Sequence, residues 1–141
     1  MALQWQDPPE CCTQVNIESN IPAKMRDGTI LYADIYRPGA NGPWPVLLMR
    51  TPYDKSQAQS ITFAHPVWYA RHGFMVVVQD CRGRWMSEGE WYPFKYEELD
   101  GYDTVNWAAQ LPGSSGYVAM YGFSYAGATQ LLAAAKSPKP L

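Results

Sequence analysis

The residues best suited to chemistry stand in one short stretch, GFSYAG, at positions 122–127. The mostly apolar run 117–123 predicts a strand, and the Ala- and Leu-rich run 125–136 predicts a helix. Glycines at 122 and 127 leave room for a sharp turn where strand and helix approach. Ser124 would project from that turn, and the helix start would direct N–H groups, led by that of Tyr125, at an oxyanion. The stretch therefore predicts a nucleophilic serine.

Composition and charge narrow the class of protein. The chain has 141 residues, of which 47% are apolar and 17% charged, as expected for one globular domain or part of a larger one. A net charge of −2 gives no reason to expect a nucleic-acid or membrane partner. Three cysteines, with no secretion signal in the N-terminal residues, predict a cytoplasmic protein. Neither a Cys-x-x-Cys pair nor a His cluster occurs, so we predict no metal and no other cofactor.

The rest of the chain predicts the elements that hold the serine in place. Apolar runs bounded by turn residues predict earlier strands over 13–24, 30–36, 46–50 and 74–79, and helices over 63–72 and 98–111. In the second helix, Leu99, Tyr102 and Val105 form the expected apolar face. This order predicts an α/β fold, in which an antiparallel β-hairpin leads into a mostly parallel sheet with helices on both faces. The strand ends should line the site.

Five short motifs occur in one order along the chain: DGT at 27–29, RTPYDK at 50–55, DCRG at 80–83, SEGE at 87–90 and GFSYAG at 122–127. This set resembles the X-Pro dipeptidyl-peptidase family of α/β-hydrolases, in particular its CocE/NonD (cocaine esterase-like) branch. The strand, turn and helix around the serine are then the nucleophile elbow of that fold. The general elbow has Gly two residues after the serine, whereas this family has it at the third place, as here.

The resemblance implies roles for three residues. Ser124 would be the nucleophile that is acylated, and the backbone N–H of Tyr125 would enter the oxyanion hole. The phenol of Tyr53 would complete that hole, since a neutral hydroxyl can donate a hydrogen bond to a developing alkoxide. The substrate would be a small-molecule ester or amide. Whether the intact protein forms a homo-oligomer stays open.

A serine nucleophile also needs a histidine base and an acid, which follow the serine in α/β-hydrolases. Residues 125–141 contain no Asp, Glu or His, and both histidines, His65 and His72, precede Ser124. We therefore expect the chain to be the N-terminal part of one α/β-hydrolase catalytic domain. The later strands, cap and jelly-roll domain that the resemblance implies would lie outside it. Alone, the chain should be inactive, with an exposed strand edge beside the elbow.

Several alternatives remain at this point. The same core serves acylases and X-Pro dipeptidyl-peptidases. A partner chain could supply the base and the acid. A truncated or degenerate hydrolase, in contrast, would be a non-catalytic protein. His65 and His72 are expected to be structural. Asp80, Arg82 and Glu88 are expected to tie down the long loop after the fourth strand. Cys81, at the end of that strand, is expected to be a buried and inert thiol.

Overall fold

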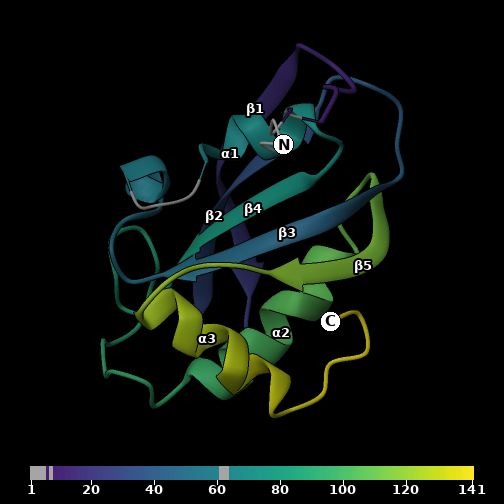
Figure 1. The fold of residues 1–141 in the computed structure, drawn as a ribbon. Helices are drawn as coiled ribbons and strands as arrows, with labels where there is room; N and C mark the ends of the chain where they lie inside the picture. The colour runs from purple at the N-terminus through teal and green to yellow at the C-terminus, as the bar shows by residue number, and fades with distance from the viewer. Residues whose placement is uncertain (1–5, 7, 61–63) are drawn as a thin grey trace, which may run out of the picture.

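The computed structural model describes residue 6, residues 8–60 and residues 64–141. The chain forms one sheet with helices on both of its sides, as Figure 1 shows. The strands are β1 (Val15–Lys24), β2 (Ile30–Pro38), β3 (Trp44–Thr51), β4 (Met75–Asp80) and β5 (Ser114–Met120). The helices are the 3₁₀-helix η1 (Lys55–Ser60) and the α-helices α1 (Pro66–Arg71), α2 (Glu97–Ala109) and α3 (Tyr125–Ala134).

The five strands lie in the order β1-β2-β4-β3-β5. β2 pairs antiparallel with both β1 and β4, whereas β3 pairs parallel with β4 and β5. In the described part of the chain β2 alone therefore runs against the other strands. The predicted hairpin that leads into a mostly parallel sheet is confirmed. Because β3, β4 and β5 are parallel, the loops that follow them leave the sheet at one edge.

The central strand β4 shows why helices cover both faces of the sheet. All six of its residues are buried, as in strands that are packed on both sides. Val77 packs in a cluster that includes Val105 and Ala108 of α2, whereas Val76 packs with Ala70 of α1 on the other face. Figure 1 accordingly shows α1 on one side of the sheet and α2 with α3 on the other. The predicted helices on both faces are confirmed.

Two predicted boundaries were wrong or partly outside the described residues. The strand predicted over 117–123 is observed as β5 at Ser114–Met120, because Ser114 already pairs with Trp44 of β3. It ends before Gly122, whose φ of 138° departs from an extended strand. The helix predicted over 63–72 is observed as Pro66–Arg71 with Pro66 in its first turn, as expected. Its predicted first residue, 63, lies outside the described residues.

The inward face of α2 also differs from the predicted one. Val105 is buried, but Leu99 is 41% exposed, so the predicted apolar face was wrong at that residue. The reason is the close approach of α3, since a Cβ on Gly101 would lie 2.7 Å from that of Ala133. Leu99 lies two residues from Gly101, so it is about 200° away around the helix axis and on a different face from this contact. The buried residues of α2 are Glu97, Asp100, Gly101, Thr104, Val105 and Ala108.

Candidate active site

The turn between β5 and α3 exposes Ser124 in a strained backbone conformation. Ser124 has φ 58° and ψ −122°, and its side chain is exposed. Gly122 is required just before it, because a Cβ there would lie 2.6 Å from that of Ala126. The close packing predicted for Gly127 was wrong, since a Cβ there would be no closer than 3.7 Å to the Gly122 carbonyl oxygen. The tight contact of the elbow is thus between Gly122 and Ala126.

Tyr125 is the first residue of α3, and its backbone and its side chain have different surroundings. The backbone N–H groups of the residues that begin a helix have no helical carbonyl before them to bond, which leaves them able to bind an anion. The Ser124 carbonyl accepts the first helical hydrogen bonds, from the N–H groups of Gly127 at 2.9 Å and Ala128 at 3.0 Å. The side chain of Tyr125 is buried instead. The role predicted for its backbone N–H stays a prediction.

Tyr53 lies beside the serine although 71 residues separate them. Its Oη is 3.5 Å from Ser124 Oγ, and its side chain is 45% exposed. The two meet because Tyr53 follows β3 and Ser124 follows β5, which are parallel neighbours in the sheet. Two of the residues predicted from the sequence therefore converge at one edge of the sheet.

The loop that carries Tyr53 is anchored on its far side by a buried lysine. The backbone N–H of Lys55 donates to Asp80 Oδ1 at 2.8 Å, and its Nζ lies 3.2 Å from Asp34 Oδ1. All three residues are buried. Burial raises the pKa of the Asp80 carboxyl, although N–H groups of Lys55 and Met86 donate to it. Asp80 therefore joins this loop to the one after β4.

Backbone strain gathers around these residues. Six non-glycine residues of the described part have a positive φ, and four of them, Asp54, Trp85, Phe94 and Ser124, are in or next to the site. Asp54 directly follows Tyr53, and the Phe94 ring stacks on the Tyr125 ring at a centroid distance of 4.6 Å. Such conformations cost about 1–3 kcal/mol each and gather at functional sites, where the surrounding structure holds them.

A buried ion pair between Arg50 and Glu97 supports the elbow through the side chain of Tyr125. Tyr125 Oη donates to Glu97 Oε1 at 3.0 Å and accepts from the Phe94 N–H at 2.8 Å. The other carboxylate oxygen of Glu97 pairs with Arg50 Nη1. Burial and the Glu97 carboxylate together raise the pKa of the Tyr125 phenol. Sequence reasoning missed this connection, because a glutamate at a helix start is usually solvated and nothing in the pattern marks it as buried.

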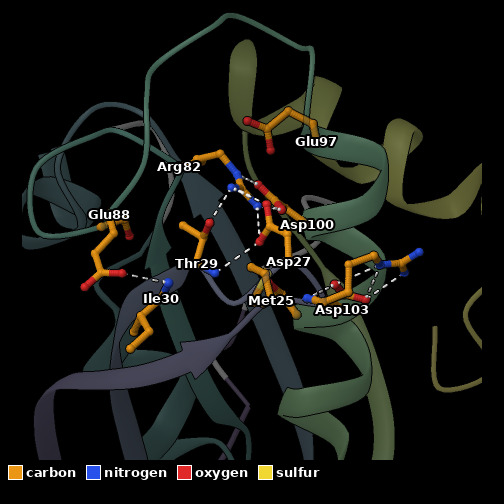
Figure 2. Close-up of polar contacts among 12 residues, drawn as sticks. Met25, Asp27, Thr29, Ile30, Arg82, Glu88, Glu97, Asp100 and Asp103 are labelled. Atoms are coloured by element: carbon orange, nitrogen blue, oxygen red, sulfur yellow. Dashed lines mark hydrogen bonds and ion pairs between the residues drawn. The ribbon is translucent and has the colours of Figure 1, made fainter.

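Arg82 joins the β1–β2 turn to α2. Figure 2 shows its guanidinium between Asp27 and Thr29 of the turn and Asp100 of the helix. Its nitrogens lie 2.8 Å from Asp27 Oδ2, 2.7 Å from Thr29 Oγ1 and 2.7 Å from Asp100 Oδ1. In the same loop, Glu88 Oε2 accepts from the backbone N–H of Ile30 at 3.1 Å. With the contacts of Asp80, these confirm the prediction that the three charged residues tie the loop down.

The contribution of this turn to the stability of the protein should depend on pH. The Arg82 guanidinium lowers the pKa of the Asp27 carboxyl to about 2 from an ordinary value of 3.8. Its contribution is therefore present above pH 3.8 and is lost as the pH falls toward about 2. We expect Asp27→Asn to lower the thermal unfolding midpoint at about pH 7, and only modestly, because the side chain is 49% exposed. The gap from wild type should close toward about pH 2, and a constant gap would contradict this.

The two histidines have structural contacts, as expected. His65 Nδ1 accepts from the Val67 N–H at 3.1 Å and caps α1. The ring nitrogens of His72 lie 2.6 Å from the Trp68 carbonyl oxygen and 3.0 Å from that of Pro8. His65 therefore caps α1, and His72 joins α1 to the N-terminal segment at Pro8.

Cys81 is fully buried, and burial raises its pKa, which confirms the predicted buried thiol. Within residues 6, 8–60 and 64–141, no three His, Cys, Asp or Glu side chains gather as a metal ion would need. In the same residues, none of the helices has the length and apolar character needed to cross a membrane.

Comparison with known proteins agrees with this fold. The sequence pattern of the X-Pro dipeptidyl-peptidase (S15 family) matches residues 27–141. The chain is 44% identical over 121 residues to the cocaine esterase of Rhodococcus sp. (strain MB1 Bresler), covering 84% of this chain and 21% of that protein.

Two solved structures have the same fold. A CocE/NonD family hydrolase from Staphylococcus aureus superposes with a TM-score of 0.83 at 28% identity, over 92% of this chain and 27% of that one. An α-amino acid ester hydrolase superposes with a TM-score of 0.78 at 26% identity, over 98% of this chain and 26% of that one. The chain thus spans about a fifth to a quarter of the length of these relatives. From its fold and from the match over residues 27–141, the chain belongs to the X-Pro dipeptidyl-peptidase (S15) family of hydrolases, alongside CocE/NonD members.

Proposed function

We propose that this chain carries the nucleophile and the oxyanion donors of a serine hydrolase that cleaves a carboxylic ester or amide. The observation that carries the proposal is the 3.5 Å approach of Tyr53 Oη to Ser124 Oγ at an exposed, strained turn. A strained strand-to-helix turn that presents a serine is the arrangement used by nucleophile elbows. A phenol beside it supplies a hydrogen-bond donor where negative charge would develop.

The proposed reaction is acyl transfer in two steps. Ser124 Oγ attacks the substrate carbonyl carbon and loses its proton to a base. The carbonyl oxygen becomes an oxyanion, which accepts hydrogen bonds from the Tyr53 phenol and the Tyr125 backbone N–H. The C–O or C–N bond then breaks, and the alcohol or amine leaves with the proton. Water hydrolyses the acyl-enzyme on Ser124 and releases the acid.

The base and acid are proposed to come from another part of the whole protein, by which we mean the natural product that contains this chain. Residues 125–141 contain no Asp, Glu or His, and both histidines make structural contacts. In this proposal residues 1–141 are the N-terminal part of the catalytic domain, with later strands, a cap and a jelly-roll domain outside them. A second chain that supplies the base and acid is the alternative.

Accordingly, the 141-residue chain alone is expected to be inactive. Without a base, Ser124 Oγ keeps its proton and attacks a carbonyl poorly. The measurement is hydrolysis of a chromogenic aryl ester by the purified chain, beside its Ser124→Ala variant. Equal, background rates are the expected result. Turnover that disappears in Ser124→Ala would show that the chain carries its own base.

The decisive experiment is labelling of the whole protein with a fluorophosphonate, read by intact mass. We expect one adduct per chain, lost in Ser124→Ala and kept in Ser56→Ala. Ser56 is a matched control because it is an exposed serine in η1, outside the elbow. If the folded whole protein shows no Ser124-dependent adduct, the hydrolase proposal fails, and the chain is a non-catalytic relative.

Ester and amide substrates each have support. The name of the cocaine esterase relative favours an ester, whereas the description of the family favours peptides with proline in second place. We propose the ester, because the relative that is 44% identical is named an esterase. Comparison of kcat/KM for an aryl ester and for an Xaa-Pro nitroanilide separates the two. A higher value for the nitroanilide would favour the peptidase, and activity on neither would favour an acylase.

A further inference from the structure

The peptide unit that joins Pro52 to Tyr53 is held at both of its polar atoms by side chains. The Pro52 carbonyl oxygen accepts two hydrogen bonds, from Arg84 Nε at 3.0 Å and from Trp85 Nε1 at 3.1 Å. The Tyr53 N–H donates to Thr51 Oγ1 at 3.0 Å. Because a peptide unit is planar, fixing its oxygen and its nitrogen fixes the plane and the direction in which the Tyr53 Cα leaves it.

Arg84 and Trp85 come from the loop between β4 and α2, which is itself well anchored. Ser87 N–H donates to the Arg84 carbonyl at 2.9 Å, and the neighbouring Arg82 bonds Asp27 and Asp100. The Arg84 guanidinium also lies 5.2 Å from the centroid of the Trp91 ring. The two donors therefore reach the Pro52 carbonyl from a loop whose conformation is fixed by these contacts.

The conformation of Trp85 is not explained by core packing. Its φ of 47° is in the left-handed region, which is unfavourable for a bulky side chain, and the residue is 60% exposed. An exposed tryptophan gains little from burial that could offset this strain. The conformation does place the indole N–H on the carbonyl of Pro52, which is a buried residue. The hydrogen bond to Pro52 is thus the contact that accounts for the strained conformation of Trp85.

We infer that Arg84 and Trp85 are positioning residues, which aim the Tyr53 phenol at the oxyanion of a substrate on Ser124. This inference rests on the proposed function, since it requires Tyr53 to act in the oxyanion hole. Tyr53 stands between two anchors, the Pro52 carbonyl held by Arg84 and Trp85 and the buried Lys55 held by Asp34 and Asp80. Its side chain is nevertheless half exposed, so its aim depends on the backbone.

The test uses the whole protein with Arg84→Met and Trp85→Phe, each alone and each combined with Tyr53→Phe. Met keeps the aliphatic stem of Arg84 and Phe keeps an aromatic ring at position 85, and each change removes one donor to the Pro52 carbonyl. Each is expected to lower kcat for an aryl ester by about tenfold to a hundredfold, because the displaced phenol would stabilise the transition state less. KM should stay within about twofold of wild type, because substrate binding does not depend on this donor. In the Tyr53→Phe background the same changes should lower kcat by no more than about twofold, because they act through the phenol.

Arg71→Met is the matched control, since Arg71 Nε also donates to a backbone carbonyl, that of Thr13, at 3.1 Å. It should leave kcat within about twofold of wild type. If Arg84→Met does not fold, Trp85→Phe still decides, because it replaces one ring by another. An unchanged kcat, or an equal loss with and without Tyr53, would overturn the positioning role.

Labelling at Ser124 separates this outcome from a failure of the proposed function. If the wild type and the Arg84 and Trp85 variants all form the Ser124 adduct at saturating fluorophosphonate, the nucleophile stands and only the positioning role is under test. If the wild type forms no such adduct, the proposed function and this inference both fail.

Discussion

Tyr53→Phe is expected to lower kcat of the whole protein for an aryl ester by about a hundredfold to a thousandfold. The change removes the phenol oxygen that lies 3.5 Å from Ser124 Oγ and keeps the ring. A donor in an oxyanion hole stabilises the transition state more than the bound substrate, so KM should change little. Steady-state kinetics of purified protein measures both constants.

Tyr117→Phe is the matched control for this change. Tyr117 is 75% exposed and lies on β5, before the elbow. Its loss of a hydroxyl should leave kcat within about twofold of wild type. A Tyr53→Phe enzyme that keeps kcat within about threefold, with Ser124 still labelled, would show that the oxyanion is held by other groups.

Glu97→Gln is expected to destabilise the protein by about 3–5 kcal/mol. Arg50 is fully buried and Glu97 is 2% exposed, and their side chains form an ion pair. Burial works against the charge of Arg50, but Glu97 and nearby groups outweigh it, so the pKa of the guanidinium is raised. Removing the Glu97 charge therefore leaves an uncompensated cation in the core. Chemical denaturation gives the free energy of unfolding.

The neighbouring residue provides a control of the same chemistry. Glu98 also pairs with a cation, Lys136 at 3.1 Å, but both side chains are 44% exposed. Glu98→Gln should therefore cost less than about 1 kcal/mol. Replacing both partners, as in Arg50→Met with Glu97→Leu, should recover much of the loss, since it removes both buried charges. If Glu97→Gln changes stability no more than Glu98→Gln, the ion pair does not support the core as described.

Much of the fold could be predicted because local sterics and hydrophobic patterns determine it. The apolar, valine-rich stretch around Val77 is typical of a strand buried on both faces, and it is β4. The meeting of Ser124 and Tyr53 was expected from the family resemblance that the motifs carry, and the structure brings the two side chains together. Their chemical roles remain predictions for the kinetic and labelling experiments.

The contacts that support the site could not be predicted in the same way. Glu97 looks like an ordinary acidic residue at a helix start, but it is buried against Arg50 of β3 and Tyr125 of α3, which are far from it in the sequence. Leu99 lies two residues from Gly101, on a different face of α2 from the contact with α3, and is 41% exposed in spite of its hydrophobicity. The hydrogen bonds of Arg84 and Trp85 end on a backbone carbonyl, a group that every residue has and that leaves no mark in the sequence.

The strand order has a consequence for how the chain is made. β3 lies between β4 and β5, and both of these neighbours follow it in the sequence. On the ribosome, the β1–β2 hairpin can pair as soon as it emerges, whereas β3, with its run VLLM at 46–49, must wait for β4. An apolar strand without partners is prone to aggregate or to bind chaperones. A translational pause between β3 and β4 would therefore endanger the nascent chain more than a pause after β4.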